Sequence, residues 1–544
     1  QEFVKPDPDT KLVIDILFLG QRFQTKPVFA NTDMNIEQGF FLDFNPTKID
    51  VKIDTENLLR LSSPIHLVVM TVSNDNLGES KRTVIATKNI EWRWVLAYSN
   101  WKVQAEIFSC KASSSKIQAG SLGLNLSIMP FIDKKSLLAE KTVFDFINTE
   151  KKYLTQTHQD FVKYANDWWE DYKNIRKSHS NRLVKLFVNT EDKENYSYKP
   201  SPCLLFPITS GRSLSSPYEA ARFVSLIPYS QNKSLNNAKE ECYSSTHSFL
   251  CMKYGDVEDH CTLLCSILLG FGLDAYVAVG LSINGPHTWV ITRGVSEVAN
   301  NSNSSKNSGN TNNITKVYTV TFWESLTGQR TNISDPKIFR FYKKIHCVFS
   351  DKNFYANIQA DDTVFNTSYV LEDEFLWKAI AKDKIQSLVK YDFTPELSLS
   401  SLITDIHSKE AEIEKQLKTK FIQFRRSLDL GTQFDGTLGY LLSPALCNYE
   451  FERISSGTFG NEEFKQSIKN HVPEGYTFKA YPCHDVHLDS NVFFSQCMSS
   501  EIGKDILYSR GDNTRFAVRC KVYQYPQEVL SCWVMIAVKY RPIR

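Results

Sequence analysis

The sequence predicts a multidomain α+β protein, with a β-sandwich over residues 9–135, an α+β domain with leading helices over 140–395, and an α+β region over 396–544. The length of 544 residues suits about three domains of ordinary size. From Lys11 to about Pro130, short apolar runs alternate with turns and show no helical periodicity, which is typical of a sandwich. Helical and strand patterns are mixed in the remainder.

Charge and cysteine usage exclude several classes of protein. The 63 basic and 61 acidic side chains give a formal net charge of +2, too balanced for a general electrostatic hold on nucleic acid. The 12 cysteines show no Cys-x-x-Cys pair, which favours reduced thiols in a cytosolic setting over a disulfide framework. The chain opens without a signal-peptide pattern, and its start looks internal to a longer protein. We therefore expect a protein that is not secreted.

The apolar run from Leu263 to Ile283 has roughly the length of a membrane span, but Asp274 and two glycines interrupt it. A helix followed by a buried strand explains the same run, so no transmembrane segment is expected. A phosphate-binding Gly-rich loop, a Gly-x-Ser-x-Gly elbow and a His-Glu-x-x-His motif are all absent from the sequence. We expect neither a cofactor nor a resident metal.

Five stretches of the first domain are predicted strands: Leu12–Leu19, Gly39–Phe44, Pro64–Val72, Val84–Ile90 and Gly120–Met129. The stretches Gln21–Val28, Phe40–Phe44 and Gly123–Ser127 resemble a C2 domain, and the resemblance implies that the opening strand of that fold is not in this sequence. Ca²⁺ takes about six to eight oxygen ligands, whereas the loop Ser73–Gly78 offers one aspartate. The sandwich is therefore expected to dock proteins or to face lipid, not to bind calcium.

The flanking regions carry clear local patterns. A helical pattern over 143–181 indicates two helices or one with a break, and its aromatic cluster Trp168–Tyr172 is expected to seal that helix against a neighbour. Further predictions are strands at Leu183–Val188 and Cys203–Ile208, a helix starting at Ser216, a solvated loop at Asn300–Asn313, a helix at Ser408–Ser427 with a Glu414–Lys418 pair, and a closing hairpin of Phe516–Tyr523 and Val529–Val538.

The stretch from Tyr254 to Gly272 is the most informative in the chain. It predicts a helix over 257–269, because Asp256 can cap it, while Gly270 and Gly272 can end it in a left-handed conformation. Val257, Cys261, Leu264, Cys265 and Leu268 then form one apolar stripe that faces a core. Strands are predicted at Leu273–Leu281, from Gly285 onward, and at Val317–Trp323.

This layout resembles the transglutaminase-like (papain-like) superfamily, whose pattern is Gly-x-Cys at a helix start, then His-x-Trp-Val, then Trp-x-x-Asp or a close variant. Gly255 matches the glycine, His287 the base and Glu324 the acid that orients the base. Val257 stands where the nucleophile belongs, and its side chain has no lone pair to attack with. The resemblance thus implies a degenerate triad of Val257, His287 and Glu324 without catalytic residues.

Two other sets of residues offer alternatives. The competing hypothesis is an active thiol hydrolase or acyl transferase that uses Cys261 with His287. Cys261, however, lies one turn past Val257, displaced by about 6 Å along the axis, and suits a small buried side chain. Four residues of types that bind zinc lie close together in the sequence: Cys483, His484, His487 and Cys497. However, no second cysteine follows Cys483 at the short spacing that zinc sites use.

Long uncommon strings over nearly the whole chain resemble the centrosomal protein of 76 kDa family. They are Tyr164–Tyr172, Ser180–Phe187, Gly255–Gly272, Phe322–Gly328, Leu441–Leu446 and Tyr449–Arg453. The resemblance implies a cytoplasmic, cytoskeletal scaffold at the centrosome, centriole, basal body or cilium, associated with control of centriole duplication. Its expected partners are centriolar or axonemal proteins, including microtubule-associated ones. We expect the degenerate cleft around Val257, His287, Trp289 and Glu324 to bind a peptide segment of such a partner.

Overall fold

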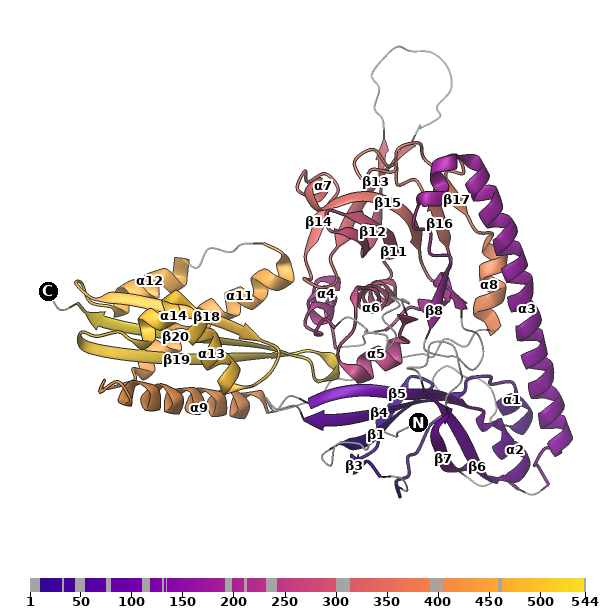
Figure 1. The fold of residues 1–544 in the computed structure, drawn as a ribbon, viewed down its shortest axis with the longest axis horizontal. Coiled ribbons are helices and arrows are strands. Elements are labelled where there is room, and N and C mark those ends of the chain that lie inside the picture. The colour runs from indigo at the N-terminus through magenta and orange to yellow at the C-terminus, as the bar shows by residue number, and fades with distance from the viewer. Residues whose placement is uncertain are drawn as a thin grey trace, which may run out of the picture. The chain divides into compact units, whose positions relative to one another are not determined.

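The structure is a computed structural model, and it describes residues 10–31, 34–44, 54–74, 80–109, 118–129, 132–133, 135–190, 198–209, 213–230, 242–299, 314–391, 399, 405–457 and 462–542. The chain forms two compact units (Figure 1). The first unit comprises 1–210, 228–325 and 331–398, and the second comprises 399–544 with two segments from mid-chain, 211–227 and 326–330. Helices and strands occur in both units, so the predicted α+β class is confirmed. The boundaries at 135, 140, 395 and 396 remain predictions.

The first unit begins with a β-sandwich. A five-stranded antiparallel sheet contains β1 (Lys11–Phe18), β2 (Gln21–Gln24), β3 (Val28–Phe29), β4 (Ile65–Asn74) and β5 (Ser80–Ile90), and a separate pair contains β6 (Asn100–Phe108) and β7 (Gln118–Ser127). Leu19 and Gly20 both have positive φ, as the tight β1–β2 turn requires. Phe18 and Trp92 meet edge to face in the core, beside η1 (Trp92–Trp94), α1 (Thr55–Leu59) and α2 (Val95–Tyr98).

Four of the five predicted strands of the sandwich are confirmed, and one is wrong. Gly39–Phe44 is extended but pairs with no described strand; instead the Gln21 side chain accepts a hydrogen bond from the Asp43 amide at 3.0 Å. Its alternation of exposed and half-buried side chains imitates a strand, because Leu42 and Phe44 still pack on the core. Strand β6 was not predicted. Residues 75–78 of the loop Ser73–Gly78, which holds the single aspartate, lie outside the described residues.

Helix α3 (Glu140–Ile175) is one continuous helix, followed by the short 3-10 helix η2 (Lys177–Asn181). Of the two predicted alternatives, the structure therefore has one helix and a separate turn. Trp168 and Tyr172 stack in parallel, and their polar atoms donate hydrogen bonds to Ala379 O and Asn357 O at 2.9 and 3.1 Å. Both acceptors belong to neighbouring strands (Figure 1), so the predicted aromatic seam is confirmed.

A seven-stranded sheet is the centre of the first unit. Its order is β14 (Arg330–Asn332), β13 (Ile314–Trp323), β12 (Gly285–Ala299), β11 (Asp274–Ser282), β15 (Tyr342–Phe349), β16 (Phe354–Asn357) and β17 (Trp377–Ala379). Around it lie α5 (Thr246–Met252), α6 (Val257–Gly270), α7 (Ile338–Phe341), α8 (Lys382–Tyr391), and a small sheet of β10 (Cys242–Tyr243), β8 (Phe187–Thr190) and β9 (Tyr198–Pro200). The strands predicted at Leu273–Leu281, from Gly285 onward and at Val317–Trp323 are confirmed. The strand predicted at Leu183–Val188 is displaced, because the structure has it at Phe187–Thr190.

The predicted strand Cys203–Ile208 is wrong. The structure has a 3-10 helix, η3 (Ser201–Leu204), followed by non-strand chain. Pro202 and Pro207 lack the amide hydrogen that strand pairing needs. The apolar run between them nevertheless has the pattern of a buried strand, which explains the wrong prediction. The predicted loop at 300–313 lies outside the described residues.

The second unit surrounds a three-stranded sheet of order β18 (Thr477–Asp485), β20 (Leu530–Arg541), β19 (Asp512–Gln524), with the turn η4 (Pro526–Glu528). Its helices are α4 (Pro217–Ser225), α9 (Ile406–Arg426), α10 (Gly436–Leu441), α11 (Ser443–Ser455), α12 (Glu462–His471), α13 (Ser490–Ser499) and α14 (Glu501–Leu507). The predicted closing hairpin and the helices at 216 and 408–427 are confirmed. Glu414 pairs with Lys418 at 3.8 Å, as predicted, and also with Arg519 at 3.2 Å.

A buried carboxylate joins the parts of this unit. Glu450 on α11 is 1% exposed and accepts two hydrogen bonds from Arg222 of α4, both at 2.9 Å. Ser531, Trp533 and Tyr525 donate three more, at 2.6, 2.6 and 2.7 Å. Burial opposes the charge, but these donors outweigh it and lower the pKa of Glu450 to about 2. The mid-chain helix α4 is thus bonded to the C-terminal sheet and helices.

Candidate functional site

Helix α6 begins where the sequence predicts. Asp256 accepts a hydrogen bond from the Asp259 amide at 3.0 Å, and the Asp259 side chain bonds back to the Asp256 amide, which forms a capping box. A Cβ at Gly255 would lie 2.6 Å from the Phe249 ring, so no larger residue fits before the helix. Gly272 has the predicted positive φ, whereas Gly270 is still helical. The helix is buried on all sides from Asp259 to Leu268, not along one stripe.

The structure brings the predicted base and acid together. His287 on β12 and Glu324, directly after β13, form a hydrogen bond between Nε2 and Oε2 of 2.9 Å. Their side chains are 13% and 16% exposed. Tyr342 donates a hydrogen bond from its hydroxyl to the same Glu324 oxygen at 3.0 Å, and burial followed by this carboxylate raises the pKa of Tyr342 far above its usual range. The acid is therefore held by two partners in the orientation that an active site of this type uses.

Aromatic side chains fix the His287 ring. The ring stacks on Trp289 at 5.9 Å with an interplanar angle of 18°, and Phe341 meets it edge-on at 5.3 Å. Trp289 is completely buried. Its indole therefore packs against the His287 ring from the buried side. It is not exposed, although it was predicted to line a cleft.

The first turn of α6 lies against the strand that carries His287. Glu258, next to Val257, accepts a hydrogen bond from the Thr288 hydroxyl at 3.3 Å and pairs with Lys185 at 3.5 Å. One turn later, Cys261 contacts the Thr288 carbonyl. Val257 is the first residue of α6 and is half-buried, and its alignment with the nucleophile of the superfamily stays a prediction.

Cys261 has none of the properties of an activated thiol. It is 0% exposed, and its sulfur lies 3.3 Å from both Thr288 O and Ser325 Oγ. Burial raises the pKa of Cys261 well above its usual value, whereas a nucleophilic cysteine needs the thiolate. In the described part of the chain, its hydrogen bonds go to these two residues and not to His287. Cys265 is equally buried, with a pKa raised by the same cause.

Metal ligands do not gather at the predicted zinc-type residues. Cys483 and Cys497 are buried in the core of the second unit, while His484 bonds to Ser531 at 3.0 Å. Among the described residues, the group that could hold a metal is instead Asp15, His247 and Cys251. Sequence reasoning missed it, and its only local signal is the four-residue spacing of His247 and Cys251. No described helix is long and apolar enough to cross a membrane.

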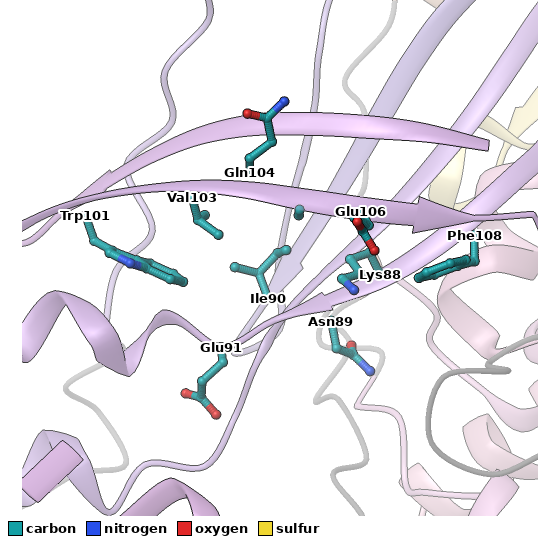
Figure 2. A pocket seen from close by; sticks show the side chains of 10 residues that line it. Lys88, Asn89, Ile90, Glu91, Trp101, Val103, Gln104, Glu106 and Phe108 are labelled. Carbon is teal, nitrogen blue, oxygen red and sulfur yellow. The ribbon is translucent and has the colours of Figure 1, made fainter. Parts of the chain in front are cut away.

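The C2-like sandwich carries a small groove of about 280 Å³ between β5 and β6. Figure 2 shows Trp101, Val103 and Ile90 pointing into it from facing strands, with Glu91 and Lys88 at the rim. This volume is at the lower limit of small-molecule pockets, which span about 300–1,000 Å³. It suits a single apolar side chain better than a whole ligand.

Three family models match consecutive parts of the chain: the CEP76 C2 domain over residues 4–134, the CEP76 peptidase-like domain over 241–380, and the centrosomal protein of 76 kDa C-terminal domain over 402–541. A relative from Xenopus laevis called centrosomal protein of 76 kDa is 35% identical over 546 residues, which is 96% of this chain and 78% of the relative. The chain belongs to the centrosomal protein of 76 kDa family.

Relatives of the same name from Homo sapiens and Danio rerio are each 34% identical, over 97% of this chain and 78% and 79% of their own lengths. In this member of the centrosomal protein of 76 kDa family, the order is a C2 domain, a peptidase-like domain and a C-terminal domain. The predicted succession of a C2-type sandwich and a transglutaminase-like domain is confirmed.

Proposed function

We propose that the chain is a non-catalytic scaffold of the centrosome, centriole, basal body or cilium, associated with control of centriole duplication. It binds centriolar or axonemal proteins through its C2 module and through the degenerate transglutaminase-like cleft. The names of the relatives support the location. The observation that supports the non-catalytic part is a valine at the start of α6 in a chain that keeps a hydrogen-bonded His287–Glu324 pair.

A cleft that keeps its shape without its nucleophile is suited to binding. His287 and Glu324 remain partly exposed, and the aromatic packing beneath the histidine makes the surface rigid. Rigid, pre-formed surfaces lose little conformational entropy when a peptide binds. A partly exposed histidine and carboxylate beside aromatic side chains provide hydrogen bonds for a peptide backbone and a contact for an apolar side chain.

The loss of catalysis is tested with a thiol-reactive acyl-type probe on the folded full chain, with labelled sites located by mass spectrometry. We expect no labelling of Cys261 in the wild type, because its sulfur is sealed in the core. We expect new labelling at position 257 in Val257→Cys, where a helix N-terminus and His287 activate a thiol. A matched Val257→Ser variant gives the same packing change without a thiol.

The competing thiol hydrolase makes the opposite prediction. If Cys261 is labelled in the wild type, and this labelling requires His287 and disappears in Cys261→Ala, the chain is an enzyme and the scaffold proposal is wrong. An unlabelled Val257→Cys protein would contradict the alignment of Val257 with the nucleophile.

The scaffold role is tested by proximity labelling with the tagged full chain in ciliated cells. We expect signal at centrioles or basal bodies, and a set of neighbours that is lost in a His287→Ala/Glu324→Ala variant. Glu463→Gln, an exposed change in the second unit, is the control. Neighbours unaffected by the cleft variant would remove the peptide-binding part, and absence from centrosomes and cilia would contradict the location.

A further inference from the structure

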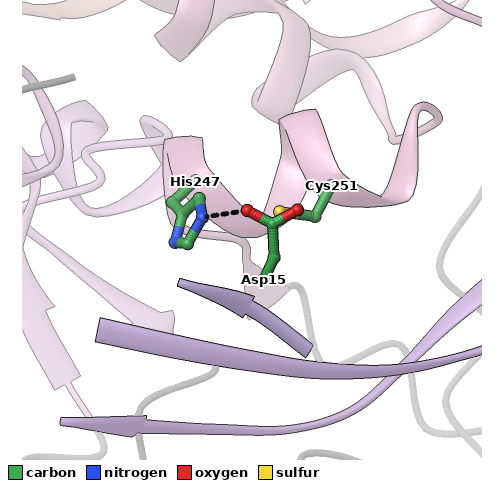
Figure 3. A group of neighbouring side chains, drawn as sticks. All are labelled: Asp15, His247 and Cys251. Atoms are coloured by element: carbon green, nitrogen blue, oxygen red, sulfur yellow. Dashed lines mark hydrogen bonds and ion pairs between the residues drawn. The ribbon is translucent and has the colours of Figure 1, made fainter. Parts of the chain in front are cut away.

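Three metal-ligand side chains meet where the C2 sheet of the first unit contacts helix α5. Asp15 comes from β1, and His247 and Cys251 come from α5, four residues apart and therefore on one helix face. Figure 3 shows both helix side chains pointing down toward the carboxylate of Asp15. A separation of 232 residues between Asp15 and His247 means that only the folded unit brings them together.

The geometry of the three ligand atoms is close to that of a metal site. A carboxylate oxygen, an imidazole nitrogen and the thiol sulfur all lie within 4.8 Å of one another. His247 Nε2 is already 3.0 Å from Asp15 Oδ1. Bonds of about 2.0–2.3 Å to a tetrahedral ion place ligand atoms about 3.3–3.6 Å apart, so a contraction of about 1 Å completes the site.

The environment is as closed as that of a structural site. Asp15, His247 and Cys251 are 4%, 1% and 1% exposed. His66 Nδ1 lies 2.8 Å from His247 Nδ1, so a hydrogen bond joins the two rings. A hydrogen bond of this kind fixes which nitrogen of a ligating histidine faces the metal.

Arg22 provides the positive charge in the metal-free arrangement. Its guanidinium donates to Cys251 Sγ at 3.3 Å and to Asp15 Oδ1 at 3.4 Å. With the thiol as S–H, the Asp15 carboxylate and the Arg22 guanidinium give the cluster one anion and one cation. Arg22 lies on the edge strand β2, and its side chain is 13% exposed.

We propose that Asp15, His247 and Cys251 bind one Zn²⁺ ion, which joins the C2 sheet to the peptidase-like domain and takes the place of the Arg22 guanidinium. Binding breaks the S–H bond of Cys251 and releases its proton to solvent, so that Zn²⁺, the thiolate and the carboxylate sum to zero charge. The buried cluster is therefore neutral with either cation. A thiolate with an imidazole favours Zn²⁺ over Ca²⁺ or Mg²⁺, which prefer oxygen ligands.

The proposal is tested on the full chain, stripped with a chelator, by metal analysis after Zn²⁺ loading and by Co²⁺ absorption. We expect one Zn²⁺ per chain and a thiolate-to-Co²⁺ charge-transfer band. Cys251→Ser and His247→Gln are expected to weaken Zn²⁺ binding at least about tenfold, because loss of a ligand costs no less than loss of an outer-shell partner, which costs about 10–100-fold. Cys447→Ser removes an exposed cysteine and is the matched control.

Arg22→Gln separates a metal site from a simple ion-pair network. Removal of the competing guanidinium is expected to tighten Zn²⁺ binding at least about tenfold, although it removes an ion pair from the metal-free fold. Wild-type protein that retains no Zn²⁺ and shows no charge-transfer band overturns the proposal. So does Zn²⁺ binding that is unchanged by Cys251→Ser or not tightened by Arg22→Gln.

Discussion

Substitution of Glu450 by Gln removes the anion that balances Arg222 in the core of the second unit. The carboxylate has a pKa near 2 in the folded protein, against an ordinary value of 4.5. This difference corresponds to about 3 kcal/mol at neutral pH, at about 1.4 kcal/mol per pKa unit. The size agrees with the loss of about 3–5 kcal/mol seen when one partner of a buried ion pair is removed.

The change is measurable as a lower melting temperature of the second unit. For a unit of about 170 residues, a loss of about 3 kcal/mol lowers the melting temperature by about 6–12 °C. Differential scanning calorimetry of the full chain at pH 7 follows this transition. Glu463→Gln, which removes an exposed carboxylate from the same unit, is expected to leave the melting temperature within about 2 °C.

The pH dependence tests the cause. Because the folded pKa is depressed, the stabilisation is fully present above the unfolded pKa of about 4.5 and is lost as the pH falls toward 2. The difference between wild type and Glu450→Gln is expected to shrink to about 2 kcal/mol at pH 3.5. A melting temperature that is unchanged at pH 7, or a difference that is the same at pH 7 and pH 3.5, would refute the electrostatic account.

Three further predictions concern the first unit. Gly255→Ala is expected to destabilise it by about 1–3 kcal/mol in urea unfolding, because the new methyl group overlaps the Phe249 ring, and an unchanged midpoint would contradict this packing. Arg93→Met removes the buried guanidinium that pairs with Glu91 and Glu150 at 2.8 and 2.6 Å. The free energy of unfolding in the same assay is expected to fall by about 1.5–3 kcal/mol. If Arg93→Lys recovers none of this loss, the shape of the guanidinium matters and not its charge. Iodoacetamide on the native chain should modify the exposed Cys447 and spare Cys261 until urea unfolds the protein, and early modification of Cys261 would show that its pocket opens.

Elements determined by neighbouring residues could be predicted from the sequence. Helix α6 was located because its cap, its acidic first turn and its terminal glycine are all within the segment. The hairpin of β19 and β20 followed from alternation around a proline turn. The Gly39–Phe44 error has the opposite origin, since alternation describes burial and does not reveal whether a partner strand is present.

Contacts between side chains from distant segments could not be predicted from local sequence patterns. The His287–Glu324 pair was found only because a superfamily motif supplied both positions. No such motif covers Arg222 and Glu450, which are 228 residues apart, or Asp15 and Cys251. A charged residue inside an apolar helix, such as Arg222 in α4, is a local sign that a buried partner is required, but it does not name that partner.

The mid-chain origin of α4 affects how this protein can be dissected. A fragment that starts at residue 396 keeps the Glu450 carboxylate and omits the guanidinium that neutralises it, and a fragment that ends at 395 carries the orphaned helix. If binding regions were mapped with such truncations, a misfolded fragment would fail to bind, and this failure would be mistaken for removal of the binding site. Point substitutions in the intact chain, or a fusion that restores residues 211–227 to the C-terminal piece, avoid that artefact.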